Sequence, residues 1–113
     1  MADAQTVRDI VLDWPETVEC SHMGVVDFRA PKRTFATLPS NARLHLKLKT
    51  DQQTMLVETQ PETFQPVAGG WGGLGWTAAD LQKLDRETLE SALDIAWQNV
   101  ALVRMKRAKA EKS

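Results

Sequence analysis

The sequence has too little cysteine and too little continuous apolar sequence for several classes of protein. Its 113 residues include a single cysteine, Cys20, so the chain cannot close an internal disulfide bond. The polar N-terminus MADAQTVRD has no apolar core of the kind found in secretory signal peptides. No apolar run approaches the roughly 18 residues that a membrane helix needs. These absences indicate a cytoplasmic protein with no membrane segment.

Internal repeats and low-complexity tracts are also missing. Hydrophobic residues make up 42% and charged residues 26% of the chain, which is ordinary for a globular protein. Because a chain of this length suits one core, we predict a single domain over residues 1–113. The basic segment at about residues 104–113 carries no apolar stripe, so we expect it to fray as a tail.

Sequence pairs that usually signal metal binding or nucleophilic catalysis are missing as well. There is no Cys-x-x-Cys, His-x-x-x-His or His-Glu-x-x-His pair, and no spacing links Cys20 to a histidine base. Gly70 to Gly75 formally match G-x-G-x-x-G, but Pro61 and Pro66 interrupt the strand that must precede a dinucleotide-binding loop. We therefore expect no enzyme activity, no bound metal and no cofactor.

Acidic residues are absent from one internal stretch, residues 28–50, although the formal net charge of the whole chain is only −1. The stretch carries six basic residues, which are Arg29, Lys32, Arg33, Arg43, Lys47 and Lys49. Acidic segments lie on both sides of it, and the chain ends in a second basic segment. The near-neutral total therefore conceals a local positive charge that could attract a polyanion.

Apolar residues at helical spacing predict a helix near each end of the chain and a short one in the middle. The first covers about residues 7–14, with Thr6 as its N-cap. The middle helix begins at Thr50, whose spacing to Gln53 fits a capping box, and ends before Pro61. A long helix begins after a third cap, Asp85, and its apolar stripe continues to residue 103.

Alternation of apolar and polar residues predicts β-strands between residues 17 and 49. Residues 25–30 and 34–38 form a hairpin about a proline-containing turn, and residues 17–22 form a weaker strand before it. In residues 43–49, one face carries Leu44, Leu46 and Leu48, and the other carries Arg43, His45, Lys47 and Lys49. We therefore expect the leucines to face the core and the basic side chains to face solvent.

The stretch AGGWGGLGW, residues 68–76, combines five glycines with two tryptophans. Because ordering glycine is entropically unfavourable, something must stabilise this segment. We predict a bend in which Trp71 and Trp76 bury large surfaces against the core, and a groove lined by the two indoles remains the alternative. The following residues, 77–84, are ambiguous between helix and strand.

Several short stretches, spread in order from about residue 18 to residue 101, resemble one known family. They are Ser21-His22-Met23-Gly24, Asp27-Phe28-Arg29, Phe35-Ala36-Thr37-Leu38, Pro61-Glu62-x-Phe64, Pro66-Val67, Gly69-Gly70-Trp71-Gly72 and Ala96-Trp97. In this order they resemble the MmcQ/YjbR family, whose members are small α+β domains of a frataxin-like or double-wing arrangement. The family carries the label "DNA-binding protein".

The resemblance implies an α+β fold, with an antiparallel β-sheet flanked by an N-terminal helix, a short middle helix and a long C-terminal helix. It favours a strand for residues 77–81 and places His22 and Trp71 near any cleft. The chain departs from the family pattern at Ala79, where a β-branched residue is usual, and at Val25-Val26, where His-Pro is frequent. Both departures weaken the edge assignments and not the fold.

Two functions from different classes fit these observations. In the first, the domain binds DNA without catalysis: the six bases of residues 28–50 contact phosphates, and an exposed tryptophan stacks on a base. In the second, a cleft near His22, Trp71 and Trp76 binds a small molecule or a protein partner. A simpler interpretation of the lysines is that they keep an edge strand from pairing with another chain.

Overall fold

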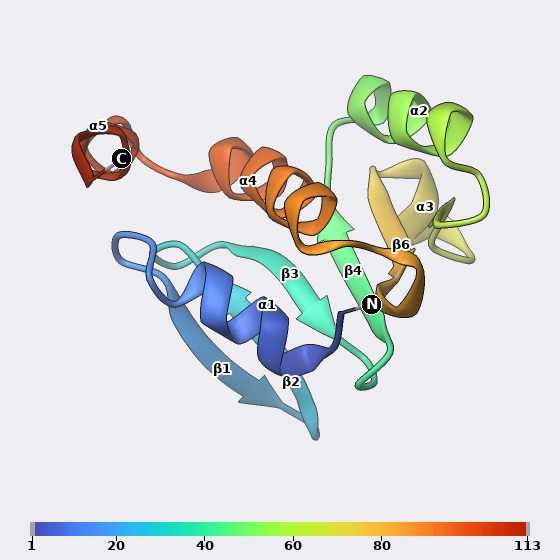
Figure 1. The fold of residues 1–113 in the computed structure, drawn as a ribbon, viewed down its shortest axis with the longest axis horizontal. Helices are drawn as coiled ribbons and strands as arrows, with labels where there is room; N and C mark the ends of the chain where they lie inside the picture. The colour runs from blue at the N-terminus through green and yellow to red at the C-terminus, as the bar shows by residue number, and fades with distance from the viewer. Residues whose placement is uncertain (1, 113) are drawn as a thin grey trace.

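The computed structural model describes residues 2–112 and confirms the predicted α+β class (Figure 1). In this part of the chain the helices are α1 (Ala4–Val11), α2 (Thr50–Thr59), α3 (Gly70–Gly73), α4 (Arg86–Val100) and α5 (Val103–Lys112), with a 3-10 turn at Leu81–Lys83. The strands are β1 (Val18–His22), β2 (Val25–Arg29), β3 (Thr34–Leu38), β4 (Arg43–Lys47), β5 (Phe64–Pro66) and β6 (Trp76–Asp80).

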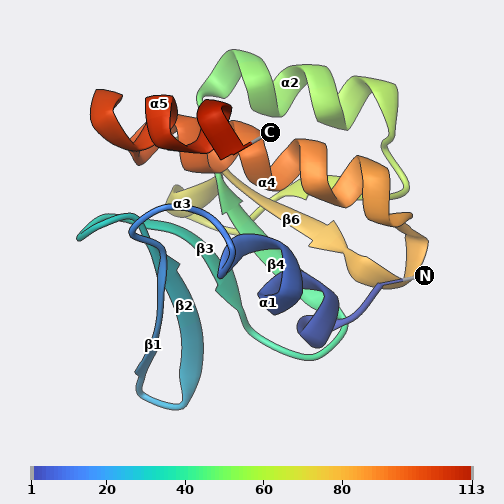
Figure 2. The same cartoon turned by 60° about the vertical axis from the view of Figure 1, so that its left-hand side comes forward.

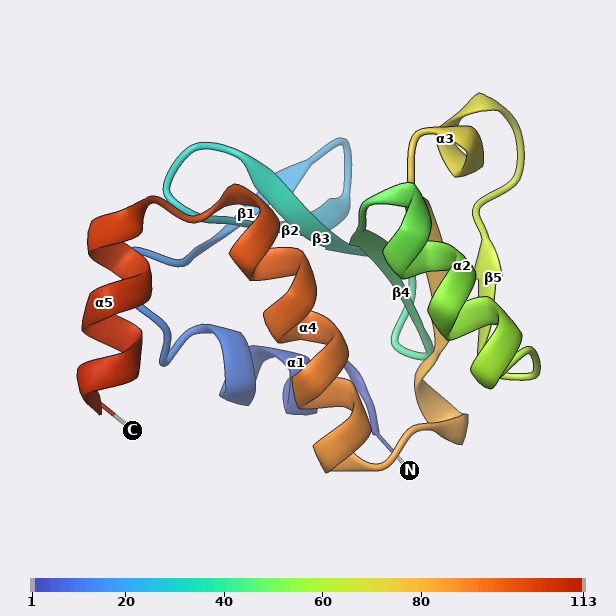
Figure 3. The same cartoon turned by 90° about the horizontal axis from the view of Figure 1, so that it is seen from above.

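The strands form one antiparallel sheet in the order β1-β2-β3-β4-β6-β5. The predicted strands before residue 50 are confirmed as β1 to β4. Strand β4 lies in the interior of the sheet, between β3 and β6, while β1 and β5 form its two edges. Helices α1 and α4 cover one side of the sheet (Figures 1 and 2), and α2 runs beside β5 (Figure 3). The other side is the one on which a ligand has access to the strands.

The leucines of β4 and of the residue that follows it face the helices, as predicted. Leu44, Leu46 and Leu48 are all buried, and each contributes roughly 2 to 3 kcal/mol of hydrophobic stabilisation. The largest side chain of the same core is Trp97 of α4, whose Nε1 donates a hydrogen bond to the hydroxyl of Thr17 at 2.9 Å. This register turns the alternate residues of β4 toward the uncovered side of the sheet.

Two predicted helix caps are wrong by a few residues. The N-cap of α1 is Asp3, whose carboxylate accepts from the backbone N–H of Thr6 at 3.0 Å, so Thr6 is the third residue of the helix. Helix α2 begins at Thr50, but its N-cap is Lys49, whose N–H donates to the Gln52 side chain at 2.8 Å. Gln53 is therefore free of any capping role and is buried instead.

The ambiguous segment after the glycines is a strand, as the family resemblance implies. Strand β6 pairs with β4 on one side and β5 on the other, and these ladders outweigh the helical propensity of its alanines. Asp85 caps α4 as predicted, accepting from the N–H of Thr88 at 2.7 Å. Helix α4 ends at Val100, slightly before the predicted end of the stripe.

The basic segment predicted to fray is instead helix α5. Met105 is completely buried in the core, and Arg104 pairs with Glu16 at 2.8 Å. The Nζ of Lys109 lies 4.1 Å from the centre of the Trp14 ring. The prediction failed because the partners Glu16 and Trp14 lie about 90 residues away in sequence, so no local periodicity indicates the contacts.

The glycine-rich segment is not the buried bend that was predicted for both tryptophans. It contains the short helix α3, and 62% of Trp71 is exposed, while Trp76 is half-buried at the start of β6. Two glycines are needed for close approach of backbones: a Cβ on Gly72 would lie 2.2 Å from the Val67 carbonyl oxygen, and one on Gly75 only 1.9 Å from that of Leu48.

Candidate functional site

The uncovered side of the sheet, which we call the open face, carries a row of side chains that crosses all six strands. Because Leu44 and Leu46 face the core, His45 between them faces the opposite way, and cross-strand partners share a face. Successive pairing places these residues side by side: Cys20, Asp27, Thr37, His45, Ala78 and Gln65. The open face therefore has a defined centre at His45, on an interior strand.

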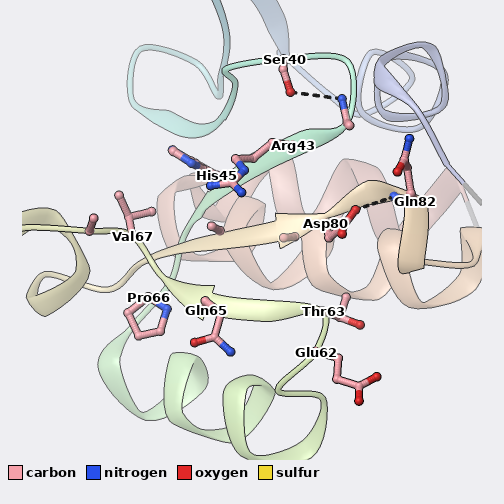
Figure 4. Close-up of a pocket in the computed structure, with 14 residues that line it drawn as sticks. Ser40, Arg43, His45, Glu62, Thr63, Gln65, Pro66, Val67, Asp80 and Gln82 are labelled. Carbon is pink, nitrogen blue, oxygen red and sulfur yellow. Dashed lines mark hydrogen bonds between the residues drawn. The ribbon is translucent and has the colours of Figure 1, made fainter.

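A pocket of about 640 Å³ lies on the open face over β4, β6 and β5 (Figure 4). Arg43 and His45 of β4 line one wall, and Gln65 of β5 lines the opposite wall. Between them the small side chain of Ala78 leaves the floor open, and Asp80 lines the end near the start of β4. Its volume falls within the range of small-molecule sites, and its lining is mixed in charge.

A second pocket of about 310 Å³ adjoins the first, and we call it the indole pocket. It is lined by Thr37, His45, Val67, Trp71 and Trp76. His45 and Val67 line both pockets, so the two lie next to each other on the open face, and we call them together the groove. The groove thus has an indole-lined end and a polar end, with His45 between them.

His45 is the titratable group at the centre of the groove. Partial burial lowers the pKa of its imidazole, and the positive charge of Arg43 two residues away lowers it further. Its side chain forms no hydrogen bond or ion pair within residues 2–112. An anionic group placed in the groove would favour the protonated ring, so ligand binding and protonation are coupled here.

Two of the six predicted basic residues are engaged within the protein. Arg29 forms a salt bridge with Asp27 at 3.1 Å, and this hydrogen bond raises the pKa of the Arg29 guanidinium. The pair is imperfect, because Asp27 Oδ1 and Arg29 Nε are buried without a hydrogen-bond partner among residues 2–112. Lys47 donates to the carbonyl of Leu74 at 2.7 Å, and its Nζ lies 5.8 Å from the centre of the Trp76 ring. Both cations are therefore partly neutralised or held in place.

The other four predicted basic residues form no salt bridge in the described part of the chain. They are Lys32, Arg33, Arg43 and Lys49, and all four are exposed. Because β4 lies inside the sheet, Arg43 has no role in keeping an edge strand from pairing. The edge-protection interpretation is therefore wrong for this strand.

The predicted basic residues gather mostly at one end of the sheet. Strand β3 runs antiparallel to β4, so the turn before β3 lies at the same end of the sheet as the last residue of β4. We call this the basic end, and it comprises Arg29, Lys32, Arg33, Lys47 and Lys49. Helix α3 lies at the same end, on the left of the view in Figure 2. Arg43 lies at the opposite end, across from Asp80.

The predicted cleft residues are only partly brought together. Trp71 and Trp76 line the indole pocket, but His22 does not line it and is exposed at the end of β1. Strands β1 and β6 are four places apart in the sheet, which separates the two strands by roughly 19 Å. His22 and Trp76 also lie at opposite ends of the sheet, so they are further apart still. The prediction for His22 failed because matching a family motif says nothing about which strand neighbours it acquires.

His45 takes the place in the groove that was expected for His22. A signal for it was present, since His45 alternates with the leucines on the same face as Arg43 and Lys47. Thr37 and Val67 carried no comparable signal, because they reach the indole pocket only through strand pairing and the path of the glycine-rich segment. Among the described residues, no cluster of three or more His, Cys, Asp or Glu side chains suits a metal ion.

The YjbR family model, described as YjbR, matches residues 12–99. No curated protein matches the chain. The chain is similar to the crystal structure of protein DR2400 of Deinococcus radiodurans, which carries a DUF419 domain: the TM-score is 0.74 and the identity 18%, over 99% of this chain and 88% of that one. At that identity the likeness supports the fold alone.

No helix between residues 2 and 112 combines the length and apolar character needed to cross a bilayer.

Proposed function

We propose that this chain, which belongs to the YjbR family, binds nucleic acid through the open face of its sheet. One observation carries the proposal. Four cationic side chains, Lys32, Arg33, Arg43 and Lys49, stand exposed without a carboxylate partner in residues 2–112. Arg43 lines the groove on the side that α1 and α4 leave uncovered, and the other three lie at the basic end of the sheet. A polyanion along the open face would therefore meet them without displacing a helix.

The distribution of charge, rather than its total, favours a phosphate backbone as the ligand. At physiological salt, exposed charges act over about 8 Å, so a ligand at the basic end senses the local bases more than distant acids. Each phosphate contact also releases a counterion, which favours binding of cationic surfaces to nucleic acid. The same proposal includes binding without catalysis, because Cys20 and His45 lie three strand spacings apart, roughly 14 Å, too far for a nucleophile and its base. It also includes a cytoplasmic location.

Fluorescence anisotropy with a labelled DNA duplex at low salt tests this proposal. The double variant Arg43→Gln/Lys49→Gln removes one cation at each end of the groove, and we expect affinity to fall on the order of tenfold per charge. Arg86→Gln is the matched control, because Arg86 is also exposed but lies at the start of α4. If the wild-type chain bound neither duplex nor single strand, the proposal would be wrong.

A second candidate function is binding of a small polar molecule in the 640 Å³ pocket. Its lining places the guanidinium of Arg43 across the groove from the carboxylates of Asp80 and Glu62. A zwitterionic or hydroxylated ligand would suit such a lining. Thermal-shift screening of such compounds separates the candidates, since Asp80→Asn would abolish their stabilising effect and leave affinity for DNA intact or stronger.

A further inference from the structure

We infer that the indole pocket is a nucleobase site, so that the open face binds single strands, with their unpaired bases, in preference to duplex. This inference rests on the proposed nucleic-acid function and specifies its ligand. It combines three observations: an exposed tryptophan held by a fixed backbone, an apolar wall facing it, and two polar side chains with unused hydrogen-bonding capacity.

The first observation is that Trp71 is exposed but its backbone is not loose. Beside it, the carbonyl oxygen of Gly72 accepts a hydrogen bond of 3.0 Å from the amide of Gln53, and the Gly72 backbone packs closely on that of Val67. The same Gln53 amide donates to the carbonyl of Trp76 at 3.1 Å. A tryptophan with 62% of its surface in water is thus presented on a preorganised support, which lowers the entropic cost of stacking on it.

The second observation concerns the shape and chemistry of the pocket walls. Two indoles and the side chain of Val67 line a space of about 310 Å³, which suits a flat aromatic ring better than a flexible chain. Lys47 approaches the Trp76 ring from the basic end, with its Nζ 5.8 Å from the ring centre. A ring bound here would therefore have a cation beside it, where the phosphate of the same nucleotide could lie.

The third observation is that Thr37 and His45 present polar groups that nothing in residues 2–112 uses. Neither side chain forms a hydrogen bond or an ion pair in this part of the chain. The Thr37 hydroxyl both donates and accepts, and a neutral imidazole has one nitrogen of each kind. The edge of a nucleobase carries the complementary donors and acceptors. The pocket can therefore stack on the face of a base and form hydrogen bonds with its edge.

Base pairing would hide both of these surfaces. In a duplex the faces of the bases are stacked on their neighbours and their pairing edges are occupied, so only a base that has left the stack can enter a pocket. Phosphate contacts at the basic end remain available to either form of DNA. The indole pocket therefore favours single-stranded over duplex DNA, whereas the cations bind the phosphates of both forms.

The test compares three ligands on the same protein: a single-stranded 12-nucleotide DNA, the duplex of that sequence, and free nucleoside monophosphates. Binding is followed by anisotropy for the labelled DNAs and by isothermal titration calorimetry for the nucleotides, since Trp71→Ala would itself remove part of a tryptophan fluorescence signal. We expect the single strand to bind at least tenfold more tightly than the duplex at equal salt. Trp71→Ala should weaken single-strand binding about 5- to 150-fold and leave duplex binding unchanged.

Leu74→Ala is the matched control, because Leu74 is exposed to the same degree in the same segment but does not line the pocket. It should leave both affinities unchanged. Calorimetric binding of free nucleotides that Trp71→Ala removes would support a nucleobase site used by soluble nucleotides as well as by strands. Equal binding of single strand and duplex, with no effect of Trp71→Ala, would overturn the nucleobase site while leaving the proposed phosphate contacts standing. If none of the three ligands bound, both the nucleobase site and the proposed nucleic-acid function would be refuted.

Discussion

Gln53 and Gly72 are joined by a hydrogen bond of 3.0 Å that connects helix α2 to the glycine-rich segment. The same side-chain amide donates to the carbonyl oxygen of Trp76 at 3.1 Å, so one buried glutamine holds the backbone on both sides of the segment. This connection explains how a stretch rich in glycine keeps one shape. It also makes the position of the exposed Trp71 a property of the fold and not of an external ligand.

Replacing Gln53 by leucine should destabilise the protein by roughly 1 to 3 kcal/mol, because the carbonyl groups of Gly72 and Trp76 would each lose one of their two donors. Urea unfolding followed by circular dichroism measures the change. Thr54→Ala, on the exposed side of the same helix, should alter stability by less than about 0.5 kcal/mol. Equal effects of the two substitutions would show that the amide has no anchoring role.

Gly75 should tolerate no side chain. Its φ of +102° is in the region that favours glycine, and a Cβ would lie 1.9 Å from the carbonyl oxygen of Leu48. Gly75→Ala should therefore cost more than about 2 kcal/mol. Gly73→Ala is the matched control, because nothing lies within 4 Å of its Cβ position, and we expect it to be neutral or stabilising by up to about 1 kcal/mol. Thermal unfolding of both variants distinguishes the two positions.

Helix α5 should contribute to global stability. Met105→Ala removes a completely buried side chain and should cost about 2 to 5 kcal/mol in denaturant unfolding. Val103→Ala, at a position where 64% of the residue is exposed, should change stability by less than about 0.5 kcal/mol. A negligible effect of Met105→Ala would mean that the segment detaches readily from the core in solution.

The titration of His45 should depend on the ligand. Because burial and Arg43 lower its pKa in the folded state, the unfolded chain takes up this proton first as pH falls. The stabilising contribution of neutral His45 is therefore complete above pH about 6.5 and is lost as pH falls through the lower folded pKa. NMR titration of the ring should show that lowered pKa, and single-stranded DNA should raise it. A pKa that DNA leaves unchanged would place the phosphates away from His45.

The salt dependence of duplex binding should show how many of the exposed cations contact phosphates. If Lys32, Arg33, Arg43 and Lys49 each neutralise one phosphate, log K should fall with log salt at a slope of about −3.6, and six contacts would give about −5.4. The double variant Arg43→Gln/Lys49→Gln should halve the slope to about −1.8. A slope that the double variant does not change would mean that the phosphates bind elsewhere.

Patterns confined to a few neighbouring residues were sufficient for most of the fold. The alternation around Leu46 correctly set the register of β4, and Asp85 correctly marked the start of α4. Strand β6 was ambiguous because its alanines favour a helix, and only its two pairing partners decide the matter. The burial of Met105 was invisible because its environment comes from distant parts of the chain.

The groove was less accessible to sequence reasoning than the fold. Alternation identified the side chains that point away from the core, including Arg43 and Lys47. It could not show that Lys47 binds the Leu74 carbonyl, nor that Asp27 pairs with Arg29, because such contacts depend on side-chain geometry. Trp71 was expected inside because large indoles usually bury, but here a short helix turns it outward.

Helix α5 packs on the helical layer, with Lys109 over the rings of Trp14 and Trp97. It therefore lies away from the side of the sheet that carries the groove (Figure 3). A tether attached beyond this helix would anchor the molecule by its helical layer and leave the side that carries His45 facing the solution. Immobilisation for surface-based measurements is best made through that end of the protein.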